Sequence, residues 1–67
     1  MAVLKVIEFM ASSPKSWKDA TIIAVKSAGK ILKGICSVNI HHMNALVKNN
    51  KITEFRVSAG ITFDVLN

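Results

Sequence analysis

The chain has 67 residues, a length that suits a single domain covering residues 1–67. Half of its residues are hydrophobic, yet no uninterrupted apolar run, Ile22 to Val25 included, is longer than four residues, far short of the roughly 20 residues of a membrane helix. The net charge of +5 comes from lysines and a single arginine, a balance that permits binding of anions but that a solvated lysine surface explains more simply.

Small size makes stability the first question. A domain of this length buries only about 60 % of the surface that its unfolded chain exposes, so it is marginally stable without a further constraint. Cys36 is the only cysteine, which rules out an internal disulfide and fits a reducing, cytoplasmic setting. We interpret Cys36 as a small, partly buried apolar residue. Self-association is the remaining source of stability, and we expect an obligate homo-oligomer.

Residues Ala2 to Met10 predict a first strand, because they are rich in β-branched and aromatic side chains. Lys5 and Glu8 interrupt the stretch and argue against a signal sequence. Apolar residues fall on both faces of this strand: Val3, Ile7 and Phe9 on one, Leu4, Val6 and Met10 on the other. A strand of this kind is buried from two sides, in keeping with subunit packing.

A helix is predicted from Trp17 to about Lys33, ended by Gly34. Ala11 to Lys15 contains the sole proline and separates this helix from the first strand. Ser16 is a good N-cap, since its hydroxyl can accept from the amide of the residue three positions on.

The helix is amphipathic. Its apolar stripe, flanked by Ile23, Val25 and Leu32, consists of Trp17, Ala20, Ala24, Ala28, Ile31 and Ile35. The opposite face carries Lys18, Asp19, Lys26, Lys30 and Lys33. Trp17 lies in line with the apolar stripe, which favours core packing over stacking on a ligand. Ile22 and Gly29 fit the pattern badly, and we expect both at a subunit contact.

Ile35 to Val47 predicts a second strand, with two sets of side chains on its opposite faces: Val38, Ile40 and Leu46 on one, Ser37, Asn39, His41 and Met43 on the other. Lys48-Asn49-Asn50-Lys51 predicts a tight hairpin, because asparagine tolerates positive φ angles. Lys51 to Leu66 predicts a third strand of strict period two, with its apolar residues at odd positions from Phe55 to Val65. The order is β-α-β-β.

No set of side chains in the sequence supports catalysis or an intrachain metal site. The chain has no glycine-rich phosphate loop, nucleophile elbow or Cys/His/Asp set, so we expect no enzyme and no catalytic residues. His41 and His42 are adjacent and are expected to point to opposite faces of their strand, which prevents them from chelating one ion together. Glu8, Glu54 and Asp64 are too scattered for an acid/base pair, although clustering of these carboxylates across subunits could build a site for a hard cation.

Arg56, the only arginine, lies in the middle of the third strand on its polar face. Its guanidinium presents a rigid fork of donors to a carboxylate, a phosphate or a planar ring. Two interpretations stand nearly even: a ligand contact, or an ion pair with Glu54, Glu8 or Asp64. A nucleic-acid interface is not favoured, because the chain lacks an arginine-rich or aromatic platform.

Short motifs along the chain resemble those of the dodecin family. They are Val3, Lys5, Val6, Ile7 and Glu8 at the start, Ser13, Pro14, Ser16 and Trp17 before the helix, then Lys51 to Val57 and Thr62 to Val65. The resemblance covers essentially the whole chain. It implies an α+β fold, a β-α-β-β protomer whose three-stranded antiparallel sheet wraps one amphipathic helix. It also implies a hollow homododecamer that binds and stores small molecules.

The resemblance further implies a flavin site between subunits. In the flavin-binding relatives a tryptophan early in the second strand stacks on the isoalloxazine, and a glutamine in the third strand bonds its polar edge. Ser37 and Arg56 occupy these cofactor-binding positions here, so neither signature residue is kept. We therefore expect weak or altered binding of a flavin such as riboflavin or FMN. Calcium is the alternative, because some dodecin-like proteins that lack the flavin residues are associated with it.

Overall fold

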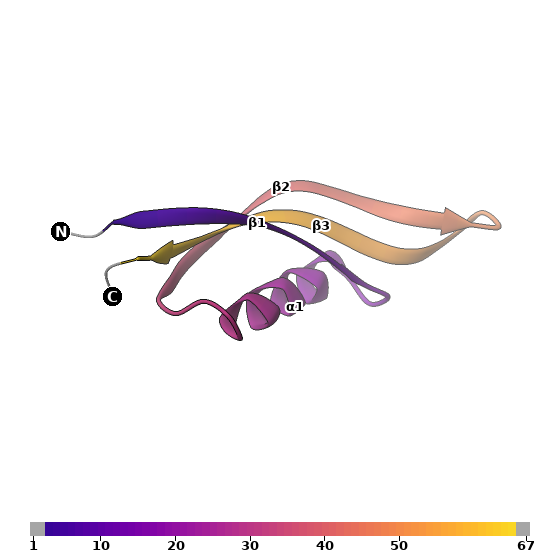
Figure 1. Cartoon of the computed structure of the whole chain (residues 1–67). Helices are drawn as coiled ribbons and strands as arrows, with labels where there is room; N and C mark the ends of the chain where they lie inside the picture. The colour runs from indigo at the N-terminus through magenta and orange to yellow at the C-terminus, as the bar shows by residue number, and fades with distance from the viewer. Residues whose placement is uncertain (1–2, 66–67) are drawn as a thin grey trace.

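The computed structural model describes residues 3–65 as one three-stranded antiparallel sheet with a helix on one face (Figure 1). The elements follow the order β1 (Leu4–Ser13), α1 (Trp17–Gly29), β2 (Ile35–Lys48) and β3 (Lys51–Asp64). The sheet order is β1-β3-β2, so β3 is the central strand and pairs with both neighbours. The predicted β-α-β-β arrangement is confirmed. Ala2 and Leu66, the outer limits of the predicted first and third strands, lie outside the described residues.

The core lies between α1 and the odd-numbered side chains of β3. Val57, Ala59 and Ile61 are fully buried, and they pack beneath Ala20, Ala24 and Ala28 of the helix. Small alanines let the helix approach the sheet closely, which suits the predicted apolar stripe. The odd positions of β3 therefore face the core, as the period of two predicts. Val65 is the exception, because it is half exposed and lies beyond the strand.

The helix begins where predicted and ends earlier. Ser16 caps it, and its hydroxyl accepts the amide of Asp19 at 2.9 Å. The last helical residue is Gly29 and not Lys33, and Gly34 lies in the following loop with a positive φ of 73°. Ile31 is consequently 74 % exposed and outside the apolar stripe. The chain leaves the helix early because it must reverse direction before Ile35 pairs with Phe63 of β3.

Asp19 was predicted on the lysine face but lies partly buried at the start of the helix. Its carboxylate accepts a hydrogen bond from the hydroxyl of Ser13, a buried residue at the end of β1. β1 runs to Ser13 and not to Met10, since Ala11, Ser12 and Ser13 continue the register against β3. Pairing with a central strand thus outweighs the weak strand preference of serine and alanine.

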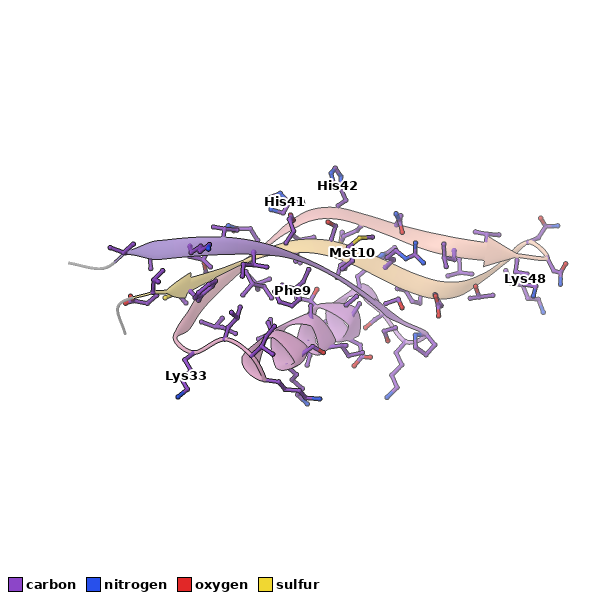
Figure 2. The ribbon with its side chains drawn as sticks, in the orientation of Figure 1. Phe9, Met10, Lys33, His41, His42 and Lys48 are labelled. Carbon is purple, nitrogen blue, oxygen red and sulfur yellow. The ribbon has the colours of Figure 1, made fainter. Side chains whose placement is uncertain are left out.

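The hairpin between β2 and β3 has the predicted two-residue turn. Asn49 and Asn50 have φ angles of 54° and 63°, as a primed turn requires. The pairing of β1 with β3 ends at Ser13 and Phe55, so only β2 and β3 form the outer part of the hairpin. It projects past both the helix and β1 as a two-stranded arm, with Lys48 near its end (Figures 1 and 2).

β2 departs from its predicted side-chain pattern at a β-bulge. Ile40 pairs with Ala59 and His42 with Ser58, so β2 has one extra residue, His41, at this point. Beyond the bulge the alternation is reversed. Met43 now lies opposite Val57, on the helix side of the sheet, and Leu46 lies opposite Glu54. The predicted grouping of Leu46 with Val38 and Ile40, and of Met43 with Ser37 and Asn39, is therefore wrong.

Candidate functional site

The face of the sheet turned away from α1, here called the open face, carries the candidate site residues. It consists of the side chains that share a face with the even positions of β3, from Glu54 to Asp64. β1 contributes Leu4, Val6, Glu8, Met10 and Ser12 to it. No part of residues 3–65 covers this face, because the single helix packs on the other one (Figure 1).

Arg56 lies on the open face between Ser12 of β1 and Asn44 of β2. It is partly buried and borders a hollow of about 360 Å³, whose other lining residues are Met10, Ala11 and Ser12. Among residues 3–65 no carboxylate forms an ion pair with the Arg56 guanidinium. A guanidinium has five N–H donors, so an anionic or planar group in this hollow would find hydrogen-bond donors in Arg56.

Ser37, the other predicted ligand position, lies far from Arg56 within one chain. It is exposed and pairs with Thr62, which is six residues along β3 from Arg56. At the rise of an antiparallel strand this separation is about 20 Å. The two residues share the open face, yet one protomer does not bring them into a common site.

Trp17 belongs to the framework that supports the hairpin. Its ring meets Phe55 of β3 edge to face, with 4.9 Å between the ring centroids, and its Nε1 donates to the carbonyl oxygen of Asn44 at 2.9 Å. Both contacts tie the first turn of α1 to the sheet near the base of the projecting hairpin. Trp17 therefore packs against the sheet, as predicted, although it is only partly buried.

His41 and His42 do not point to opposite faces, as was predicted. The bulge places both on the open face, where Figure 2 shows the two rings standing away from α1. His41 lies over Gly60, and its Nε2 is 3.4 Å from Oε1 of Glu8. This contact between β1 and β2 across the central strand was missed, because nothing local in the sequence signals a bulge. The one indication of this contact in the sequence was Gly60, which interrupts the polar side chains at the even positions of β3.

Three further residues singled out from the sequence, Cys36, Ile22 and Gly29, have no contacts that indicate a chemical role. Cys36 is exposed, not partly buried, because it occupies a second register shift between Ile35 and Ser37. Ile22 is exposed on the helix, and a Cβ at Gly29 would meet no atom within 4 Å. Both of these helix positions are free for the subunit contact that we predict there. No described helix is long and apolar enough to span a membrane.

Comparisons with known proteins agree with this architecture. A match to the Dodecin family covers residues 3–66. A mutant of the Thermus thermophilus dodecin aligns over 97 % of this chain and 97 % of its own, with a TM-score of 0.91 and 18 % identity. The dodecin from Streptomyces davaonensis aligns over 96 % of this chain and 94 % of its own, with a TM-score of 0.91 and 14 % identity.

A third solved structure is nearer in sequence. The calcium-chelating antigen calcium dodecin from Mycobacterium tuberculosis is 28 % identical, has a TM-score of 0.81, and aligns over 92 % of this chain and 89 % of its own. No curated protein sequence matches the chain. Since the family match spans nearly every residue and the fold agrees throughout, the chain belongs to the dodecin family.

Proposed function

We propose that this chain is the protomer of a hollow homododecamer that binds and stores a small molecule and catalyses no reaction. Family membership supports the assembly and the storage role. The observation that carries ligand binding is Arg56, which borders an open hollow and has no ion-pair partner among residues 3–65. A guanidinium in that position suits an anionic or planar ligand.

Exposed apolar surface supports the assembly. Thirteen large apolar side chains of the described chain are exposed, and the molecule measures 51 × 19 × 13 Å, too elongated to cover them itself. They include Leu4, Val6 and Met10 on β1 and Val47 and Ile52 on the hairpin arm. A two-stranded hairpin is marginally stable in water, so contact with other copies is needed to hold the arm. Light scattering tests this, with twelve times the protomer mass of 7.3 kDa expected.

A site that uses both Ser37 and Arg56 takes them from different copies, because about 20 Å separates them within one chain. Serine offers no stacking surface, and arginine, unlike glutamine, has no acceptor for the imide edge of a flavin. Arginine does add a positive charge. We therefore infer weak or altered flavin binding, in which an anionic group near Arg56 gains a charge-assisted contact.

Flavin fluorescence provides the test. Wild-type protein is titrated into riboflavin and into FMN, and quenching is compared with that of Ser37→Trp. The variant is expected to bind between about twofold and tenfold more tightly, the worth of one aromatic stacking contact. Ser27→Trp is the matched control, since Ser27 is an exposed serine on α1. Equal gains in affinity in both variants contradict the placement of the site. If none of the three proteins quenches flavin fluorescence, flavin is excluded as the ligand.

An ion-binding shell is the second candidate, favoured by the 28 % identity to the M. tuberculosis calcium dodecin. Within residues 3–65 no three potential metal-ligating side chains of His, Cys, Asp or Glu come together. A calcium site therefore needs oxygen ligands from several copies. Thermal unfolding with calcium and with chelator tests this function: a higher melting temperature with calcium supports it, whereas equal temperatures exclude it.

A further inference from the structure

Three exposed apolar side chains of the hairpin arm lie on one face, the helix side of the sheet. The bulge in the middle of β2 places Met43 there, opposite Val57. A second register shift follows between Leu46 and Val47. Because Leu46 lies on the open face, Val47 lies on the helix side, together with Ile52, with which it pairs. Met43, Val47 and Ile52, here called the arm strip, are 58 %, 65 % and 55 % exposed.

No part of residues 3–65 covers the arm strip. α1 begins at Trp17, whose ring packs on Phe55 near the base of the arm, and it runs from there away from the arm (Figure 1). Apolar surface thus continues from the core onto the arm beyond the end of the helix. Contiguous exposed apolar surface marks a contact site, and a two-stranded hairpin is only marginally stable without such a contact.

The tip of the arm adds a requirement for negative charge. Lys48 pairs with Lys51 across the turn, and neither forms an ion pair among residues 3–65. Like charges directly opposite each other destabilise a strand pair, and a carboxylate close to both removes this repulsion. The arm therefore fits a surface that is apolar and carries an exposed carboxylate.

A second copy of this chain offers such a surface on β1. Its side chains Leu4, Val6 and Met10 are 54 %, 57 % and 71 % exposed. They share the open face with Glu8. Leu4 and Met10 lie about 20 Å apart along the strand, enough to receive the arm strip, which extends over about 14 Å of β2. Glu8 contacts His41 through Oε1 only, and a carboxylate has further acceptor sites for an ammonium group.

We infer that the arm strip of each copy packs on the β1 surface of a second copy, with Lys48 and Lys51 next to the partner subunit's Glu8. The inference rests on the proposed homo-oligomer and names the surfaces through which its copies meet. The contact is heterologous, because the arm of one copy meets β1 of another. Each copy therefore gives one arm and receives one, an arrangement that builds closed assemblies of more than two chains.

Light scattering on the full-length protein at several concentrations measures assembly, and circular dichroism on the same samples reports folding. Val47→Glu puts a charge into the arm strip, so it is expected to weaken association by about tenfold or more and to lower the mass toward the 7.3 kDa protomer. Val47→Thr keeps the branched shape, and a weaker loss of assembly is expected from it even if the glutamate variant does not fold. Ile31→Glu is the matched control, because Ile31 is 74 % exposed and lies outside both surfaces.

Charge reversal tests the receiving surface. Glu8→Lys and the double variant Lys48→Glu/Lys51→Glu are each expected to weaken assembly, and all three substitutions together are expected to restore it, because the charges are then exchanged between arm and β1. A monomeric wild type overturns both this contact and the proposed assembly. Folded Val47 variants that assemble like the wild type overturn this contact alone, as does an equal loss in Ile31→Glu or a triple variant that assembles no better than the charge-reversed variants from which it is built.

Discussion

Replacing Trp17 tests whether this residue supports the fold, as its contacts indicate, or stacks on a ligand. The edge-to-face contact with Phe55 and the Nε1 bond to the carbonyl oxygen of Asn44 join α1 to the sheet. Trp17→Phe removes the hydrogen bond and keeps an aromatic ring, whereas Trp17→Ala removes both contacts. The pair of variants therefore separates the two contributions.

The expected sizes follow from the exposure of each contact. A hydrogen bond contributes about 0.5–1.5 kcal/mol, and because this one is exposed, Trp17→Phe should cost about 0.5 kcal/mol. The ring contact adds about 0.5–1.5 kcal/mol beyond area burial. Trp17 is partly buried, so Trp17→Ala should cost about 2–3 kcal/mol, below the value for a fully buried aromatic residue.

Urea unfolding followed by far-UV circular dichroism measures these costs at a fixed protomer concentration, since assembly contributes to stability. Circular dichroism is needed because Trp17 is the only tryptophan. A double-mutant cycle with Phe55→Ala should yield a coupling energy of about 0.5–1.5 kcal/mol. A coupling near zero, or a Trp17→Ala protein of unchanged stability that has lost flavin quenching, would refute the structural role.

Three further predictions concern stability and use the same urea assay. Ile61→Ala should cost about 2–5 kcal/mol because Ile61 is fully buried, whereas Ile31→Ala, at an exposed position, should change stability by less than about 0.5 kcal/mol; similar costs would contradict the placement of the core. Asn50→Val should cost about 1–2 kcal/mol because φ at Asn50 is 63°, while Asn50→Gly should be tolerated; an unaffected valine variant would argue against the primed turn. Ser16→Ala should cost about 1 kcal/mol through the lost helix cap, and an equally stable protein would show that the cap is dispensable.

Patterns confined to one element were predictable from the sequence. The alternation in β3, the Ser16 cap and the Asn49-Asn50 turn each depend on neighbouring residues, and all three are present in the structure. The candidate site was predictable in part. The polar face of β3 was identified, but the distance between Ser37 and Arg56 follows from strand pairing, and whether either residue contacts a ligand stays a prediction.

Features that depend on contacts between distant segments were decided by the tertiary structure. β1 extends to Ser13 because β3 offers it partners, and α1 ends at Gly29 because the chain must turn back to start β2. The bulge at His41 has the largest consequence, since one extra residue reverses every later side chain of β2 and brings both histidines to the open face. The local sequence determined which segments are strands and helix; the register between strands, which the chain settles only on folding, determined which side chains meet.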